Sequence, residues 1–362
     1  MTTQPSLIIK LWGVRGSVPT PLSAEDIHQK QAELLKRLCK DGGSEKLFGN
    51  PAQPEKMEQW LHSLPFSMTG TYGGNTTCFE VRGQNSPLIM IDAGTGARLM
   101  GVSLLKRLVA KQALNPLNTV KASERDIHLF FSHYHWDHLQ GFPFFGPAFT
   151  YGPSKINFIF YGRRDAKQHL SDVLGGQQEC PNFPVAWEDM PCNKTFVELG
   201  RLEPHPVQIG ETTVTYQELT HPDSVFGYAF TCNGKRFVYA TDTEHRDIPD
   251  PRLLKLAKDA DYLYYDSQYS PSEYRGDPGS LPGPFHKFDW GHSTYEWAIK
   301  SALAANVKAV LLGHHEPIRN DFQLESLLAE AVAFRNTMLA KPEYAGRTLD
   351  VQLAKEGLEI VL

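Results

Sequence analysis

The sequence has few cysteines, and their spacing does not suggest cross-linking or metal binding. Five cysteines, Cys39, Cys78, Cys180, Cys192 and Cys232, are scattered through 362 residues, and no two of them form a CxxC pair. An odd, dispersed set of this kind disfavours both a disulfide framework and a zinc ribbon built from cysteines. Separate reduced thiols, typical of an intracellular protein, are the simplest interpretation.

Long apolar runs and an excess of basic charge are also missing. No stretch approaches the roughly 20 apolar residues that span a bilayer. The opening MTTQPSLIIKLWG lacks the basic start and long apolar core of a signal peptide. We therefore expect a soluble, cytoplasmic protein with no membrane partner. The net charge of −5 disfavours a binder of extended nucleic acid that relies on a broad basic surface.

The rest of the composition is that of a globular protein. With 41% hydrophobic and 21% charged residues, the chain is neither wholly disordered nor fibrous. Strand-like runs dominate early, as in residues 7–12, 78–83 and 126–133, and helical stretches such as 292–305 and 321–340 alternate with strands later. This order predicts an α/β (α+β) protein in which two packed sheets carry helices on their outer faces, an αββα sandwich. Ser23 and Asp26 form a capping-box pattern that begins a helix, and Gly42 and Gly43 end it.

Histidine is abundant, with 14 residues, and four metal-ligand side chains fall within six positions of one segment. The segment FFSHYHWDHLQG contains His133, His135, Asp137 and His138. His133 and His135 are two residues apart, so in an extended segment both point to the same side. Asp137 and His138 fall in the following turn and can face a second point nearby. The segment could thus serve two adjacent metals, and a chance surface cluster of histidines is the plainer alternative.

Further candidate ligands follow strands elsewhere in the chain. His221 follows TVTYQELT, Asp242 follows KRFVYAT and His314 follows KAVLLG. Loops at strand ends can present side chains while the sheet holds them still. We favour His314 over the adjacent His315 because it directly ends the apolar strand, but either remains a candidate. A ligand set of nitrogen and oxygen without thiolate suits zinc, manganese or iron, and the two oxygens of Asp242 could bridge two ions.

This pattern resembles the metallo-β-lactamase superfamily, in which an HxHxDH motif is followed by a later His, Asp and His. The resemblance extends from Ile8 to about Pro317, and it implies a four-layer αββα metallo-β-lactamase fold that holds two divalent metal ions, zinc in first place. By the resemblance, one metal is held by His133, His135 and His221, the other by Asp137, His138 and His314, and Asp242 bridges them. β-Lactamases of this fold usually have Cys where Asp242 stands, so antibiotic hydrolysis is not favoured.

Four other segments are similar to ribonuclease Z and class II cyclic-nucleotide phosphodiesterases, namely WGVRGSVPTP, YGGNTTC, IDAGTG and GHST. Arg15 and Asn75 lie in the first two and would contact phosphate or substrate, with loop scaffolding as the alternative. Asp92 in IDAGTG would lie near the metals without binding them. His292 in GHST matches a histidine thought to protonate the leaving oxygen; its alternative role is capping a helix.

The chain also departs from ribonuclease Z. About fifty residues, 21–71, separate PTP from YGGN, which predicts a helical insertion in a single metallo-β-lactamase-like domain covering 1–362. A basic, Gly- and Pro-rich arm for tRNA is missing. Asp266 in YYDSQY stands where ribonuclease Z carries the histidine of His-Glu-Ala-Thr. Together with the acidic charge, these departures argue against tRNA processing, since a large polyanion needs many Lys and Arg contacts.

The resulting hypothesis is a two-metal phosphodiesterase that hydrolyses a small phosphodiester, with a cyclic nucleotide as the best single candidate. Hydroxide held by the metals would attack, Asp137 would orient it as well as bind metal, and His292 would donate the proton to the leaving oxygen. The alternatives are a carboxylic-ester, lactone or thioester hydrolase on the same fold, a ribonuclease Z-like RNA endonuclease, and a non-catalytic metal-binding scaffold. Exposed helices permit a homodimer.

Overall fold

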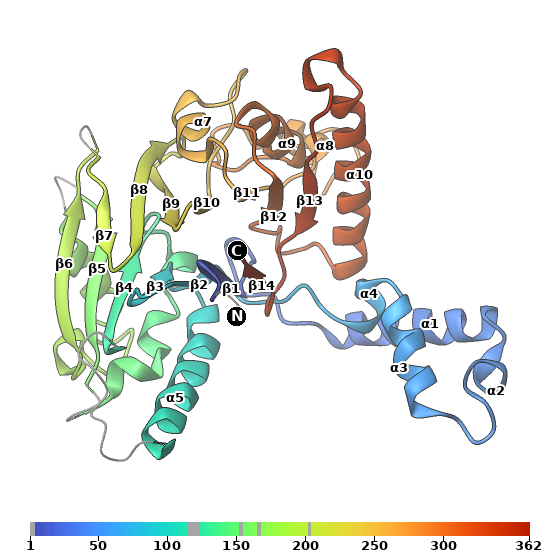
Figure 1. Ribbon diagram of the computed structural model, residues 1–362, viewed down its shortest axis with the longest axis horizontal. Helices are drawn as coiled ribbons and strands as arrows, with labels where there is room; N and C mark the ends of the chain where they lie inside the picture. The colour runs from blue at the N-terminus through green and yellow to red at the C-terminus, as the bar shows by residue number, and fades with distance from the viewer. Residues whose placement is uncertain (1–3, 115–123, 152–154, 165–167, 202–203, 282) are drawn as a thin grey trace.

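The computed structural model describes residues 4–114, 124–151, 155–164, 168–201, 204–281 and 283–362. These residues form two seven-stranded sheets, ordered β14-β1-β2-β3-β4-β5-β6 and β13-β12-β11-β10-β9-β8-β7 (Figure 1). The strands of the first sheet are β1 (Leu7–Gly13), β2 (Cys78–Gly83), β3 (Leu88–Ile91), β4 (Asp126–Phe130), β5 (Asn157–Arg163), β6 (Asn193–Leu199) and β14 (Glu359–Val361). Those of the second are β7 (Val207–Ile209), β8 (Thr212–Leu219), β9 (Val225–Cys232), β10 (Lys235–Ala240), β11 (Tyr262–Asp266), β12 (Ala309–Gly313) and β13 (Asp350–Leu353).

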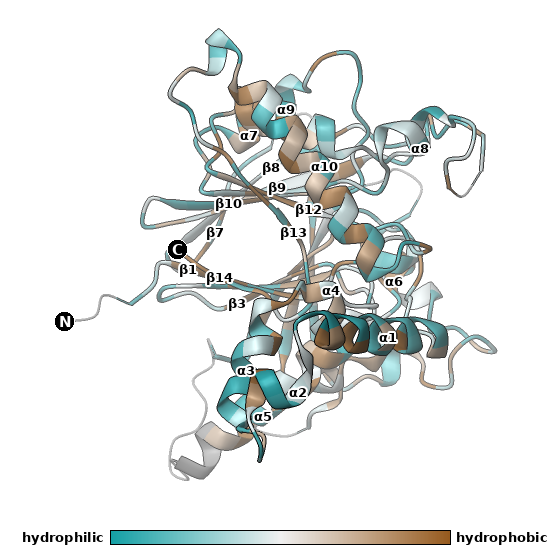
Figure 2. Ribbon diagram, turned by 90° about the vertical axis from the view of Figure 1, so that its right-hand side faces the viewer, coloured by the Kyte–Doolittle hydropathy of each residue, from teal (hydrophilic) through white to brown (hydrophobic). Residues whose placement is uncertain are grey.

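Helices lie on the outer faces of both sheets, which confirms the αββα sandwich. The α-helices are α1 (Ala24–Lys40), α2 (Gly43–Phe48), α3 (Pro54–Ser63), α4 (Phe66–Thr69), α5 (Gly96–Leu114), α6 (Leu170–Gly176), α7 (Pro251–Ala257), α8 (Pro271–Arg275), α9 (Tyr295–Ala304) and α10 (Asp321–Leu339). Short 3-10 helices are η2 (Trp136–His138), η3 (Phe142–Phe144), η4 (Gly146–Phe149), η6 (Trp187–Asp189) and η7 (Pro342–Tyr344). Figure 2 shows the two strand layers with α7 and α9 beyond one sheet and α5 beyond the other. None of the helices in the described residues has the length and apolar character needed to cross a lipid bilayer.

Apolar side chains fill three layers, one between the sheets and one under each helical layer. Buried aromatic rings dominate the layer between the sheets, where Phe79 packs edge-on against Tyr264 and Phe130 stacks on Tyr161. β1 buries every second residue, as a strand at the face of one core must. β12 is buried along its whole length, because it runs parallel to both of its neighbours inside the second sheet. The sheets are therefore held rigidly where they carry the loops discussed below.

Parallel pairing brings particular strand ends to one level. β3 runs parallel to β4, and the pair Ile91–Phe130 ends their ladder. In the second sheet β10, β11 and β12 are parallel, and Asp266 pairs with Gly313 at the last position. The carboxyl ends of parallel strands open at the same edge of a sheet. Asp92, Asp242 and His314, which come one or two residues after these strands, are thereby placed at the ends of their sheets.

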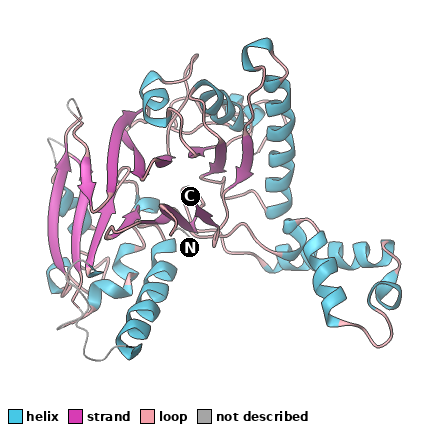
Figure 3. Ribbon diagram, in the orientation of Figure 1, coloured by secondary structure: helices cyan, strands magenta, loops and turns pink. Residues whose placement is uncertain are grey.

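Four helices, α1 to α4, fall between β1 and β2, in the stretch where the sequence predicted a helical insertion. α1 begins with the predicted capping box, in which Ser23 Oγ accepts from Asp26 N and the Asp26 carboxylate accepts from Ser23 N. Figure 3 shows α1, α2 and α3 extending away from the strands. Their base is attached to α10 by an ion pair of 2.6 Å between Lys30 and Asp321. No residue of α1 is buried, so this helix contributes little to the core.

Candidate metal centre

The seven candidate ligands lie together beside the carboxyl ends of the parallel strands. Three groups of side chains have ligand atoms within 4.8 Å of one another, and the third of them comprises Asp242, Asp266, His292 and His314. The first group comprises His133, His135, His221 and Asp242, and the second comprises Asp137, His138, Asp242 and His314. The first and second groups coincide with the two sets that the resemblance implied, and Asp242 belongs to both of these sets.

The two carboxylate oxygens of Asp242 face different groups. Oδ2 lies 3.6 Å from His133 Nε2, whereas Oδ1 lies 3.3 Å from His138 Nε2 and 3.2 Å from His314 Nε2. Asp137 Oδ2 lies 3.3 Å from His138 Nε2 and 3.4 Å from His314 Nε2. A single carboxylate placed in this way can serve one ion with each oxygen.

Unpaired nitrogen atoms test whether these residues fit a metal. The Nε2 atoms of His133, His138 and His221 are buried and have no hydrogen-bond partner in the part of the chain that the structure describes. Leaving a buried polar atom unpaired costs about 1–3 kcal/mol. These three nitrogen atoms lie close to carboxylate oxygens, and imidazole nitrogen and carboxylate oxygen are both ligand atoms that zinc prefers. The residues therefore fit the divalent metals that the fold implies, while the choice among zinc, manganese and iron stays a prediction.

The protonation states suit the same purpose. Burial lowers the pKa of His221 to about 4 and lowers that of His133 well below its usual range, so both rings are neutral near pH 7. Burial alone would raise the pKa of the Asp242 carboxyl, but the charges of His314 and His138 outweigh it and hold this pKa well below its usual range. Burial would lower the pKa of His138, but the carboxylates of Asp137 and Asp242 outweigh burial and hold this pKa well above its usual range. Since neutral imidazole and ionised carboxylate are the forms that bind a cation, a metal at the second group would displace a proton from His138.

Asp92 lies behind the second group and orients one of its rings. This buried carboxylate accepts hydrogen bonds from Ser132 N, Ser132 Oγ and Tyr239 OH at 2.8, 2.8 and 2.7 Å. Its Oδ2 also lies 2.8 Å from His138 Nδ1. A proton on Nδ1 leaves Nε2 of His138 with a lone pair directed at Asp137 and Asp242. Asp92 thus contacts a candidate ligand but belongs to none of the three groups, and its position next to the metals, which the resemblance implied, stays a prediction.

Other ligand rings are held through their second nitrogen as well. His314 Nδ1 lies 3.0 Å from Gln268 Oε1, and the backbone N–H of His314 donates to Tyr264 OH at 2.8 Å. His135 Nε2 lies 2.9 Å from Asp223 Oδ2, which leaves Nδ1 of that ring for a metal. Sequence reasoning missed Asp223, which stands in no recognisable motif, and also Gln268, because the YYDSQY segment was compared with ribonuclease Z only at Asp266. Only the packing of the loops reveals them.

Backbone geometry is unusual at three of these positions. Asp92, Asp242 and His314 all have positive φ, at 53°, 46° and 55°, which is uncommon for residues other than glycine. Strained backbone of this kind concentrates at functional sites. The first glycine-rich loop also comes very close, since a Cβ on Gly16 would lie 2.5 Å from the His314 ring. Beside it, Ser17 N donates to Asp137 Oδ2 at 2.8 Å.

His292 stands beside the ligands with one nitrogen occupied. Its Nδ1 lies 2.8 Å from Asp266 Oδ2, and its ring centroid lies 4.9 Å from that of His314. Burial would lower the pKa of His292, but the Asp266 carboxylate outweighs burial and raises it to about 9. The ring therefore carries a proton near neutral pH. His292 does not cap α9, whose N-cap is Thr294.

Three other candidate residues lie in different surroundings. The Arg15 guanidinium is buried and donates to the backbone carbonyls of Gly73, Glu316 and Arg319. Asn75 donates from both its backbone N and its Nδ2 to the Glu356 carboxylate. Both geometries favour the scaffolding alternative over contact with substrate. His315 points away from the ligands, with Nε2 2.8 Å from Ala354 O, and the ring that joins the cluster is that of His314.

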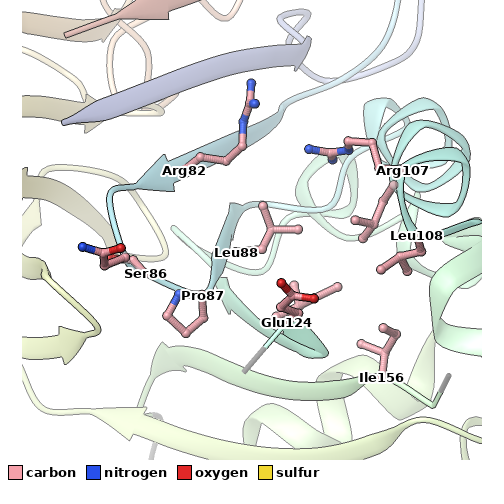
Figure 4. A pocket seen from close by; sticks show the side chains of 11 residues that line it. Arg82, Ser86, Pro87, Leu88, Arg107, Leu108, Glu124 and Ile156 are labelled. Atoms are coloured by element: carbon pink, nitrogen blue, oxygen red, sulfur yellow. The ribbon is translucent and has the colours of Figure 1, made fainter. Parts of the chain in front are cut away.

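A separate cavity of about 670 Å³ lies between α5 and the ends of β2 and β3 (Figure 4). Leu88, Leu108 and Ile156 line it together with Arg82 and Arg107. Both arginines pair with the buried carboxylate of Glu80. Among the described residues, Glu124 is the only carboxylate in this lining and no histidine joins it, so the cavity does not gather imidazole and carboxylate groups as the metal-ligand cluster does.

Comparison with known families agrees with this geometry. Residues 88–315 match the family described as "Beta-lactamase superfamily domain", a range that begins at β3 and ends just after His314. The chain therefore belongs to the β-lactamase superfamily, which confirms the resemblance seen in the motifs.

Individual relatives are similar over shorter or more distant matches. A ribonuclease Z of Synechocystis sp. is 36% identical over 129 residues, 33% of this chain and 35% of the relative. The chain thus spans about a third of the length of the first curated relatives it matches. A ribonuclease Z of Sulfurisphaera tokodaii is 24% identical over 247 residues, 58% of this chain and 77% of the relative. Yeast PDE1 shares the fold with a TM-score of 0.55 and 13% identity, covering 99% of this chain and 100% of that one.

Proposed function

We propose that the chain is a metal-dependent phosphodiesterase that acts on a small phosphodiester, and that a cyclic nucleotide is the best single candidate. The observation that carries this proposal is the division of Asp242 between two groups of ligands, with the protonated His292 beside them. Pairs of metal ions clamp the attacking and leaving oxygens of phosphoryl transfer.

Some of the site residues would bind the metal ions, and others would orient water or donate a proton. His133, His135 and His221 would hold one ion, and Asp137, His138 and His314 the other, with Asp242 shared. Bound divalent metal supplies Lewis-acid stabilisation and lowers the pKa of water toward ~7. Asp137, fixed by the backbone N–H of Ser17, would orient the attacking water. His292, with Nδ1 on Asp266, would donate its proton to the leaving oxygen, a contribution of typically ~10²–10⁴-fold.

Exposed aromatic side chains near the ligands support a substrate with a planar group. Trp136 lies between His135 and Asp137 and is 71% exposed. Trp290 is 50% exposed and precedes Gly291, which lies so close to the His221 ring that a Cβ added to it would be 2.2 Å from that ring. Exposed tryptophans beside a binding site favour stacking with a nucleobase, which adds about 1–3 kcal/mol per base.

Metal analysis combined with an ester panel tests the proposal. The protein purified with zinc or manganese should contain close to two ions per chain. It should hydrolyse bis(p-nitrophenyl) phosphate and cyclic nucleotides in preference to lactones and thioesters. Two bound ions without turnover of any ester would instead identify a metal-binding scaffold, and preference for a lactone or thioester would identify the other class of hydrolase.

A ribonuclease Z-like RNA endonuclease is the second candidate, because the curated relatives carry that name. This similarity weighs against the expectation that extended nucleic acid is not a partner. A cavity of about 340 Å³ beside His221 is lined by Arg163, Arg201 and Arg252, and also by Glu218 and Asp223, so its charges are mixed. Cleavage of a tRNA precursor at its 3′ trailer, faster than that of any cyclic nucleotide, would favour this candidate.

A further inference from the structure

We infer that Glu244 is a positioning residue that fixes the position of His292 relative to Asp242. This inference rests on the proposed function. Glu244 follows Asp242 by two residues and is 2% exposed. It belongs to none of the three groups of candidate ligands. Its carboxylate is directed instead at the loop that carries His292.

Three hydrogen bonds tie this carboxylate to segments that are distant in sequence. Oε1 accepts from Tyr274 OH at 2.6 Å and from the backbone N–H of Asp289 at 2.8 Å, and Oε2 accepts from the backbone N–H of Gly291 at 3.2 Å. Hydrogen bonds to a charged acceptor are stronger than neutral ones. Glu244 thus fixes the backbone immediately before His292 and also fixes α8 through Tyr274.

Neighbouring contacts hold the same loop from its other side. Ser293 N donates to Asp266 Oδ1 at 3.1 Å, and Ser293 Oγ lies 2.9 Å from His245 Nδ1. Glu244 and His245, two successive residues that follow the candidate bridging ligand, therefore grip the residues on both sides of His292. One short segment therefore sets the distance between Asp242, a candidate ligand, and His292, the proposed proton donor.

The carboxylate cannot be replaced by an amide without loss. A glutamine at position 244 has one acceptor oxygen and one NH2 group. If its oxygen keeps Tyr274 and Asp289, the NH2 faces the Gly291 N–H; if it is flipped, the NH2 faces the Asp289 N–H. In either orientation the NH2 group of the glutamine faces a backbone N–H, so two donors repel each other and the loop is pushed away from position 244. A displacement of about 1 Å in a catalytic group can cost 10²-fold in rate.

The experiment compares E244Q with wild type on a series of methyl aryl phosphodiesters whose leaving groups run from 4-nitrophenol to phenol. Poor leaving groups need the proton of His292, whereas 4-nitrophenolate leaves without it. We expect kcat of E244Q to fall about 10- to 100-fold on the phenyl ester and less than 3-fold on the nitrophenyl ester, with metal content unchanged. An equal fall on both esters, or no fall, would overturn the inference.

Asp261→Asn is the matched control. Asp261 is also buried and accepts a backbone N–H, from Arg236 at 2.8 Å, but it precedes β11 at the opposite end of that strand. Any fall in kcat of the D261N variant relative to wild type should be the same for the phenyl ester and the nitrophenyl ester.

Amide hydrogen exchange in the metal-free protein gives a readout that needs no activity. The Asp289 and Gly291 amides should exchange at least 10-fold faster in E244Q and at the wild-type rate in D261N. Unchanged exchange at both amides in E244Q would refute the role of Glu244 even if the enzyme is active. Should wild type hydrolyse none of the series, the proposed function fails, and exchange alone decides whether Glu244 holds the loop.

Discussion

Replacing Asp92 with asparagine should loosen the metal centre without touching a ligand. The buried carboxylate accepts four hydrogen bonds, three on Oδ2 and one on Oδ1. An asparagine has one acceptor oxygen instead of two and no charge, and its NH2 group opposes either the N–H of Ser132 or the Nδ1–H of His138. About two bonds to a charged acceptor are lost, each worth about 1.5–3 kcal/mol. The free energy of unfolding should therefore fall by about 3–6 kcal/mol.

Metal affinity should fall as well, because Asp92 selects the ring nitrogen that His138 offers. Removing a partner of this kind typically costs ~10–100-fold in affinity. Competition with a fluorescent zinc chelator measures the affinity, and urea unfolding of the metal-free protein measures the stability. The D261N variant removes a buried carboxylate far from the ligands and should lower stability without changing metal affinity.

Unchanged zinc affinity in folded D92N would refute this reasoning. That result would mean that His138 keeps its orientation by packing alone, and that the 2.8 Å contact with Asp92 is incidental. A loss of affinity as large in D261N as in D92N would also contradict it, because general softening of the fold would then explain both.

Three further predictions follow from the site. His292→Ala should keep both metal ions by elemental analysis and lose ~10²–10⁴-fold in kcat on substrates with poor leaving groups; lost metal would make His292 a ligand. In metal-free protein, NMR should show His292 titrating near pH 9 and Asp266→Asn lowering that pKa. Because the folded pKa lies above the unfolded value of ~6.5, the stability gained from this pair is complete below that pH and disappears as pH rises through 9. Trp290→Ala should weaken competitive inhibition by AMP roughly 5- to 150-fold but should leave inhibition by methyl phosphate unchanged.

The fold was largely predictable because its signals are local and periodic. Strand β1 alternates along its length and β12 is a short apolar run, and each ends at a glycine. The capping box at Ser23 is a contact within four residues. The candidate ligands were recoverable for a related reason, since a residue that directly follows a buried strand must appear at the sheet edge.

Contacts between loops could not be predicted in the same way. Gln268 reaches His314 across 46 positions, and Glu244 reaches Gly291 across 47. Nothing in the spacing of either pair marks it, because the register between loops is set by sheet order. Arg15 illustrates the converse case: an arginine in a glycine-rich loop suggested phosphate, yet its guanidinium donates to backbone carbonyls.

The edge strand β14 gives the chain an order of assembly. Residues 359–361 pair with β1, and β1 leads directly into the loop where Gly16 and Ser17 meet His314 and Asp137. Until β14 is synthesised and paired, one side of β1 is without its hydrogen-bond partners, although every candidate ligand precedes β14 in the chain. The ability to bind metal should therefore arise only after β14 has paired with β1. Deleting β14 should weaken metal binding even though β14 supplies no ligand atom.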